Sequence, residues 1–248
     1  MKYRLSAFLL ALVLPFILAS CGEKDENLLD KLGQDHVIPT DIYDDPNVQI
    51  NNHGNNSPDD KKSTARELSG SHLIKIDCIL QNPELPTGCE ITSLAMVMNY
   101  LGYDISKTTL ASDYLTKDYV GKVGFDQAFI GDPTWEDGYG CFAPVIVNAA
   151  NKYLNKHQMK YSAWNLSGTD FKELFKYIDI DIPVIVWASM GLMEVYKNPC
   201  FVDANGNQVY WYDNEHCVVL CGYDISENTV TAADPLDGIV KYDIDDFE

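Results

Sequence analysis

The sequence predicts an α+β domain in which helices come first and an antiparallel sheet follows. Apolar residues recur at helical spacing between Glu90 and Ile178, and the pattern changes to strand-like runs from Pro183 onward. This order is typical of helices packed against an antiparallel sheet. The chain has 248 residues, of which 46% are hydrophobic, so it can form one sizeable core and still carry additional sequence.

The additional sequence lies at the N-terminus. Lys2 and Arg4 precede an apolar run, residues 5–18, which is shorter than the roughly 20 residues that a membrane-spanning helix needs. Small residues then lead into Cys21, a pattern that resembles a bacterial lipoprotein signal. We therefore expect residues 1–20 to be removed and Cys21 to carry lipid, with a transmembrane anchor as the alternative.

Residues 21–70 are rich in Asp, Glu, Asn, Lys and Ser, and they contain few large apolar side chains. Such a segment buries too little surface to offset its ordering entropy, so we predict a flexible acidic tether. The formal charge of the chain is -19, which argues against nucleic acid as a partner because phosphates require clustered Lys and Arg. The lipid would then hold the protein at the extracytoplasmic face of a bacterial membrane.

The folded domain, residues 71–248, is predicted element by element. Two prolines and a glycine in "NPELPTG" require a turn, and the helix after it carries apolar residues on one face until Gly102, a plausible C-cap. Thr169 is the expected N-cap of the last helix. The predicted elements are a strand over 71–80, helices over 89–101, 106–115, 142–154 and 169–178, a glycine-rich loop over 124–140, a strand over 183–190, a hairpin over 202–212 with Asn205-Gly206 at its tip, and strands over 216–224, 229–235 and 239–244.

Cys89 stands where the turn meets the first helix. Backbone N–H groups are unpaired at a helix start and the helix dipole favours negative charge there, so we expect this thiol to lean toward thiolate, as a nucleophile would. The six cysteines other than Cys21 are expected to be mostly reduced and buried, with one disulfide possible. The chain lacks CxxC spacing, so we predict neither a metal nor another cofactor.

Three further residues could serve Cys89. Of the five histidines, His216 alone opens an apolar strand, and Asp234 ends the next strand, so antiparallel pairing should bring the two side chains together. Gln81 lies across the turn, where its amide and the N–H of Cys89 could form an oxyanion hole. Taken singly, each has a simpler interpretation: a packed histidine, a turn aspartate before Pro235 and a surface glutamine.

Several motifs together resemble one protein family. The segments "QNPELPTGCEITSLAMVMNYLGY", "GDP…GYGCFAP", "PVIVW", "EHCVVLCGYD" and "DPLDG", in this order, resemble the C39-like papain-type cysteine peptidases, which are grouped after the bacteriocin-processing peptidases, in a stand-alone secreted form. The resemblance implies a papain-like fold, with the nucleophile at a helix N-terminus in a helical layer packed on a C-terminal antiparallel sheet. It also implies that Cys89 is the nucleophile, His216 the general base, Asp234 its orienting group and Gln81 the oxyanion donor.

The expected function is hydrolysis of peptide bonds in a peptide or protein substrate by a monomeric enzyme. Gly88, Trp135, Tyr139 and Trp187 are assigned to substrate binding. The leader-processing relatives are fused to membrane exporters, whereas this sequence carries no transmembrane bundle and no GxxxxGK[ST] phosphate loop, so bacteriocin maturation at a transporter is not expected. Two alternatives remain open: a transglutaminase-like acyl transferase and a catalytically inert peptide-binding lipoprotein.

Overall fold

The structure, a computed structural model, describes residues 9–13, 68–159 and 161–248. The predicted cleavage position before Cys21, its lipidation and nearly all of the predicted tether, residues 21–70, lie outside these residues. No helix among the described residues is both long enough and apolar enough to cross a membrane.

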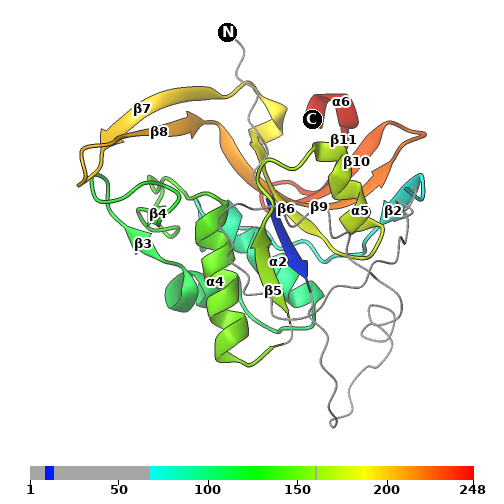
Figure 1. The fold of residues 1–248 in the computed structure, drawn as a ribbon, viewed down its shortest axis with the longest axis horizontal. Helices are drawn as coiled ribbons and strands as arrows, with labels where there is room; N and C mark the ends of the chain where they lie inside the picture. Colours follow the sequence, from blue (N-terminus) through cyan, green and yellow to red (C-terminus); the bar gives the residue numbers. More distant parts are fainter. Residues whose placement is uncertain (1–8, 14–67, 160) are drawn as a thin grey trace, which may run out of the picture.

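One antiparallel sheet forms the centre of the fold, with strand order β11-β10-β9-β6-β1-β5 and the short β2 paired to β9 (Figure 1). β1 comes from the run assigned to the signal peptide, and its backbone pairs with both β5 and β6. β9 is buried from Glu215 to Tyr223, which explains its continuous apolar run. The strands are β1 (Leu9–Val13), β2 (Ser71–Leu73), β5 (Ser162–Asn165), β6 (Val184–Ser189), β9 (Glu215–Asp224), β10 (Thr229–Asp234) and β11 (Gly238–Asp243).

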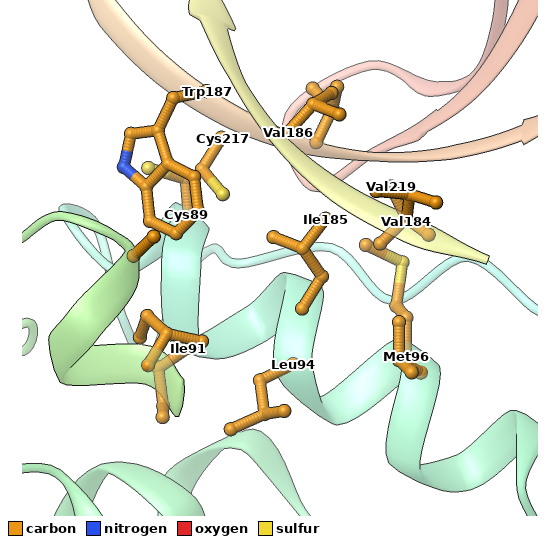
Figure 2. Packing of buried hydrophobic residues seen from close by; sticks show 14 of the residues in the cluster. Cys89, Ile91, Leu94, Met96, Val184, Ile185, Val186, Trp187, Cys217 and Val219 are labelled. Carbon is orange, nitrogen blue, oxygen red and sulfur yellow. The ribbon is translucent and has the colours of Figure 1, made fainter. Parts of the chain in front are cut away.

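Helix α2 (Cys89–Tyr100) begins at the predicted residue and packs against β9 and β6. We expected it to bury one face, but every residue from Cys89 to Met98 is buried. The reason is that α2 also contacts α3, α4 and η2 on the sides turned away from the sheet. Figure 2 shows Ile185 of β6 pointing from the sheet toward α2. The helix therefore lies inside the domain, and its first residue is held rigidly.

The other helices lie near their predicted ranges. The segment predicted over 106–115 consists of α3 (Lys107–Thr109), capped by Ser106, and the π-helical turn η2 (Leu110–Tyr114). α4 (Ala143–Lys156) matches the helix predicted over 142–154. The last region divides into a 3₁₀ turn, η3 (Phe171–Leu174), and α5 (Phe175–Ile178), and its cap is Asp170 rather than Thr169. Two short helices were not predicted: η4 (Met190–Leu192) and α6 (Ile244–Phe247).

The strand predicted over 71–80 pairs in the sheet only as far as Leu73. The N–H of Ile74 still donates to the carbonyl of Cys221 at 2.8 Å, and the chain then leaves β9. It runs past the end of β10, where the N–H of Gln81 donates to the carbonyl of Pro235 at 2.8 Å. This path brings Gln81 beside the end of the strand that carries Asp234.

A separate hairpin, β7 (Tyr196–Val202) and β8 (Gln208–Asp213), has the predicted turn at Asn205-Gly206, where Gly206 takes a φ of +85°. In Figure 1 the hairpin crosses above β3 (Lys117–Asp118) and β4 (Phe129–Ile130), a short parallel pair that was not predicted. Trp211 joins the hairpin to the domain, since its ring centroid lies 4.4 Å from that of Phe125. The hairpin therefore packs against the two ends of the loop over 124–140, at Phe125 and Tyr139.

Candidate active site

Cys89 lies at the first residue of α2, where the turn before it is fixed by its own hydrogen bonds. The N–H of Leu85 donates to the carbonyl of Gln81 at 3.0 Å, and the N–H of Gly88 donates to the carbonyl of Leu85 at 2.9 Å. A Cβ on Gly88 would lie 2.7 Å from the Cβ of Leu85, so the position before the cysteine has no room for a side chain. The turn thus sets where the sulfur lies.

The thiol of Cys89 is 7% exposed and donates to Oε2 of Glu90 at 3.4 Å. Burial raises its pKa well above the ordinary value, and the nearby carboxyls of Glu90 and Glu215 raise it further. This is opposite in direction to the thiolate character that we expected from the helix start. Loss of solvent around the sulfur disfavours the charged form, so this arrangement favours the neutral thiol.

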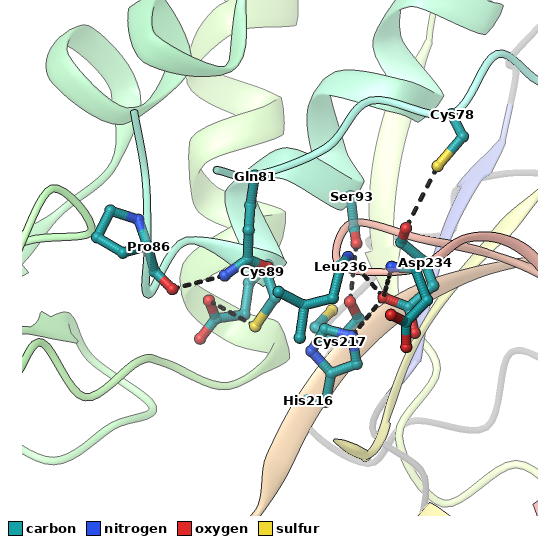
Figure 3. A network of polar contacts seen from close by, with 11 residues as sticks. Cys78, Gln81, Pro86, Cys89, Ser93, His216, Cys217, Asp234 and Leu236 are labelled. Atoms are coloured by element: carbon teal, nitrogen blue, oxygen red, sulfur yellow. Dashed lines mark hydrogen bonds and ion pairs between the residues drawn. The ribbon is translucent and has the colours of Figure 1, made fainter. Parts of the chain in front are cut away.

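His216 and Asp234 come into contact, as the strand order suggested. Nε2 of His216 lies 2.7 Å from Oδ1 of Asp234, and both side chains are buried (Figure 3). The register of β9 and β10 shifts between Thr231 and Ala232 on the way to this contact. In Figure 3 the imidazole lies between the Asp234 carboxyl and the sulfur of Cys89.

The carboxylate of Asp234 is held by several donors. Its Oδ1 also accepts from the N–H of Leu236 at 2.7 Å and from that of Asp237 at 3.4 Å. Burial acts to raise the pKa of Asp234, but the hydrogen bond with His216, its charge and these backbone donors together lower it below the ordinary value. Asp234 is therefore an ionised group whose position and charge are both fixed.

Gln81 is buried beside the helix start. Its Nε2 donates to the carbonyl of Pro86 at 2.7 Å, and within the described part of the chain its Oε1 has no hydrogen-bond partner. Nζ of Lys107 donates to the carbonyl of Gln81 at 2.7 Å, which fixes the backbone. An amide nitrogen carries two hydrogens, so one N–H of Gln81 remains beyond the bond to Pro86.

Two buried glutamates beside the thiol were not assigned a role from the sequence. Oε1 of Glu90 accepts from the N–H of Cys141 at 2.7 Å, and burial raises the pKa of Glu90 to about 7. Burial and the charge of Glu90 raise the pKa of Glu215 well above its ordinary value. The available signal was position: Glu90 directly follows Cys89 inside an apolar helix, and Glu215 directly precedes His216.

Gly140 makes room for the Glu90 carboxyl. A Cβ built on Gly140 would lie 2.5 Å from Oε1 of Glu90 and 2.7 Å from the ring of Trp211. The indole of Trp187 donates to the carbonyl of Cys141 at 2.9 Å, next to the N–H that Glu90 accepts from. The segment at 140–141 thus connects the buried carboxyl to the hairpin and to β6.

The residues assigned to substrate binding lie in two different environments. Trp135 and Tyr139 are 44% and 39% exposed, and Thr87 donates to the carbonyl of Trp135 at 3.1 Å, so their loop lies beside the turn before Cys89. Gly88 lies within that turn. Trp187 is 2% exposed and packs in the core, so its assignment to substrate contact is a correction: a side chain buried on β6 offers no surface to a ligand.

The six described cysteines are all free thiols. Cys89, Cys141, Cys217 and Cys221 are buried, whereas Cys78 and Cys200 are partly buried. Cys89 also belongs to the one group of potential metal ligands found among the described residues, together with Glu90 and Glu215.

Comparison with known proteins gives consistent matches. The sequence model of the Peptidase_C39-like family matches residues 73–248. The uncharacterized protein YvpB of Bacillus subtilis strain 168 is 32% identical over 174 residues, which cover 67% of this chain and 67% of that protein. A crystal structure of a candidate C39-like peptidase from Bacillus anthracis is similar with a TM-score of 0.60 and 31% identity, covering 72% of this chain and 90% of that one.

Proposed function

Because the chain belongs to the Peptidase_C39-like family, we propose that it is a cysteine peptidase in which Cys89 is the nucleophile, His216 the general base and Asp234 the group that orients His216. The observation that carries the proposal is the buried contact of 2.7 Å between His216 and Asp234 on the side of the imidazole away from Cys89. A carboxylate in that position fixes the ring and stabilises its charged form, as a Cys-His-acid site requires.

The state of the thiol determines how the reaction begins. Burial raises the pKa of the Cys89 thiol, so the second ring nitrogen of His216 takes the thiol proton as the sulfur attacks the substrate carbonyl. The new C–S bond makes a tetrahedral intermediate with a negative oxygen. His216 then gives the proton to the leaving amine, the C–N bond breaks, and water hydrolyses the thioester.

The free N–H of Gln81 and the backbone N–H of Cys89 are the donors for the negative oxygen. The first N–H groups of a helix have no partner within it, so that of Cys89 is available to a ligand. The Gln81 amide is held by Pro86 and by the backbone bond to Pro235, and it need not reorganise as charge develops. The exposed Trp135 and Tyr139 form the nearby surface for the substrate chain.

We further propose that the enzyme acts at the extracytoplasmic face of a membrane, held by lipid on Cys21. The support is the sequence before Cys21, where small residues follow a short apolar run. Cleavage there would also remove β1 from between β5 and β6.

The test is Cys89→Ala in the full-length protein, with Cys200→Ala as the matched cysteine control. Both proteins are incubated with a peptide library, and new N-termini are counted by mass spectrometry. We expect Cys89→Ala to lower cleavage by more than about 10³-fold, because the nucleophile is lost, and Cys200→Ala to retain it.

The same samples are treated with a peptidyl electrophile that modifies thiols. Modification should map to the peptide containing Cys89 in the control and disappear in Cys89→Ala. Retained cleavage in Cys89→Ala would refute the assignment, and products in which an amine is incorporated, without new N-termini, would favour acyl transfer instead.

A further inference from the structure

Three side chains with metal-binding atoms converge at the start of α2. The sulfur of Cys89 and one oxygen each of Glu90 and Glu215 all lie within 4.8 Å of one another. They come from the first two residues of the helix and the first residue of β9, so the core of the domain holds all three together.

The spacing suits a shared ion. The sulfur of Cys89 lies 3.4 Å from Oε2 of Glu90. A tetrahedral zinc ion with bonds of about 2.3 Å to sulfur and about 2.0 Å to oxygen holds two such ligands about 3.5 Å apart. This pair therefore has the required separation already, and because all three atoms lie within 4.8 Å of one another, Glu215 would move inward by at most about 1.5 Å to complete the set.

An independent observation points to a missing ligand at Glu215. The residue is 9% exposed, and no residue in the described part of the structure gives its Oε1 a hydrogen bond. A buried polar atom without a partner costs free energy, and so does a second carboxyl placed beside the first. A cation between the two carboxyls removes both costs.

We propose that Cys89, Glu90 and Glu215 form a zinc-binding site that holds the sulfur of Cys89 as a metal thiolate, with water as the fourth ligand. Sulfur among the ligands favours zinc over magnesium or calcium, which prefer oxygen. Binding releases the proton of the thiol, and that of any protonated carboxyl, to solvent. No electrons are transferred, and chelation reverses the reaction.

The consequence for activity rests on the proposed function, whereas metal binding itself does not. A sulfur bonded to zinc shares one of its lone pairs with the metal, which lowers its reactivity toward a carbonyl, and the ion occupies the space beside the sulfur. His216 stays with Asp234 and takes no part in the site. The zinc form would therefore be a resting, inhibited form of the peptidase that becomes active when the metal is removed.

The experiment is a titration of the full-length, EDTA-treated protein with Co²⁺ under reducing conditions, followed by displacement with Zn²⁺. A thiolate bonded to cobalt gives a charge-transfer band in the near ultraviolet, which reports the Cys89 ligand without any assay of activity. We expect one Co²⁺ per chain, the appearance of this band, and its loss when Zn²⁺ is added.

The variants Cys89→Ser and Glu215→Gln test the ligands, with Cys200→Ser and Glu227→Gln as matched controls away from the site. Cys89→Ser should lose the band. Glu215→Gln should weaken metal binding by at least about 10-fold. Even substitutions of residues that only contact a metal ligand lower metal affinity by that much. Circular dichroism establishes that each variant is folded, and Cys89→Ser, which changes one atom, carries the test if Glu215→Gln does not fold.

The outcomes separate the two proposals. Absence of the band at millimolar Co²⁺, or its persistence in Cys89→Ser, would overturn the metal site whether or not the protein cleaves peptides. A metal-binding protein that cleaves nothing after chelation would retain the site and refute the peptidase. Zinc that binds with these ligands while cleavage continues unchanged would overturn the inhibited form.

Discussion

The two sides of the candidate site differ in how well their polar groups are paired. On one side, His216 and Asp234 are joined at 2.7 Å, and the carboxylate accepts further backbone N–H groups. On the other side, oxygens of Gln81 and Glu215 have no partner among the described residues, and two buried carboxyls lie beside a neutral thiol. The first side is complete without a ligand, and the second is not.

This difference indicates where a ligand acts. Buried groups are normally satisfied, so an incomplete set in a rigid core is a place where something else binds. A substrate oxyanion would accept from the spare N–H of Gln81, the unpaired Oε1 of Gln81 would accept from a ligand donor, and a cation would bind Glu215. His216 and Asp234 need no further partner, because their hydrogen bonds already hold the two side chains in position.

Among the substitutions that test this comparison, Gln81→Ala is expected to have the largest effect, a loss of kcat. Removal of one oxyanion donor should lower kcat by about 10²–10³-fold, because the substrate oxygen loses stabilisation as it becomes negative, with little change in KM. The measurement is steady-state kinetics on a peptide identified in the cleavage screen. Gln127→Ala, at an exposed glutamine, is the control, and an unchanged kcat in Gln81→Ala would exclude the oxyanion role.

A smaller effect, on stability, is expected from Gly140→Ala. The added Cβ would press on the Glu90 carboxyl at 2.5 Å and on Trp211 at 2.7 Å, so either must shift. We expect a loss of about 1–3 kcal/mol in the free energy of unfolding, the usual cost of overpacking a core. Urea denaturation measures it.

Gly124→Ala is the matched control for this substitution. No atom lies within 4 Å of a Cβ built on Gly124, and its φ is outside the left-handed region. If both alanine variants were equally stable, Gly140 would not be what makes room for Glu90.

The sequence predicted the backbone arrangement better than the environment of each side chain. The start of α2 at Cys89 and the order of β9 and β10 follow from local patterns, and antiparallel pairing then brings His216 near Asp234. The α+β class is likewise confirmed. These features depend on hydrophobic periodicity and turn residues, which can be recognised from residues close together in the sequence.

What the sequence did not predict depends on packing from several directions. α2 is buried on all sides because elements distant in sequence pack around it. The hydrophobic periodicity of the helix itself gives no information about these elements. Trp187 lies in a strand that is apolar on both faces, so alternation could not show that it faces the core. Glu90 and Glu215 meet only through the contact of α2 with β9, although each stands next to a residue that the motifs identified.

The smallest effect concerns the paired side and its dependence on pH. Because the pKa of Asp234 is lowered in the folded protein, ionised Asp234 contributes stability above the unfolded value of about 3.9, and that contribution is lost as pH falls through the lower folded value. Asp234→Asn lacks this contribution at every pH. The difference in unfolding free energy between wild type and Asp234→Asn should therefore be greatest near neutral pH and should shrink below about pH 4.

Urea denaturation from about pH 7 to about pH 3 measures this difference, with the exposed Asp237→Asn as a control for a nearby change of charge. A difference that stays constant over this range would mean that Asp234 contributes through its shape and not through its charge, and the contrast between the two sides of the site would then lose its electrostatic basis.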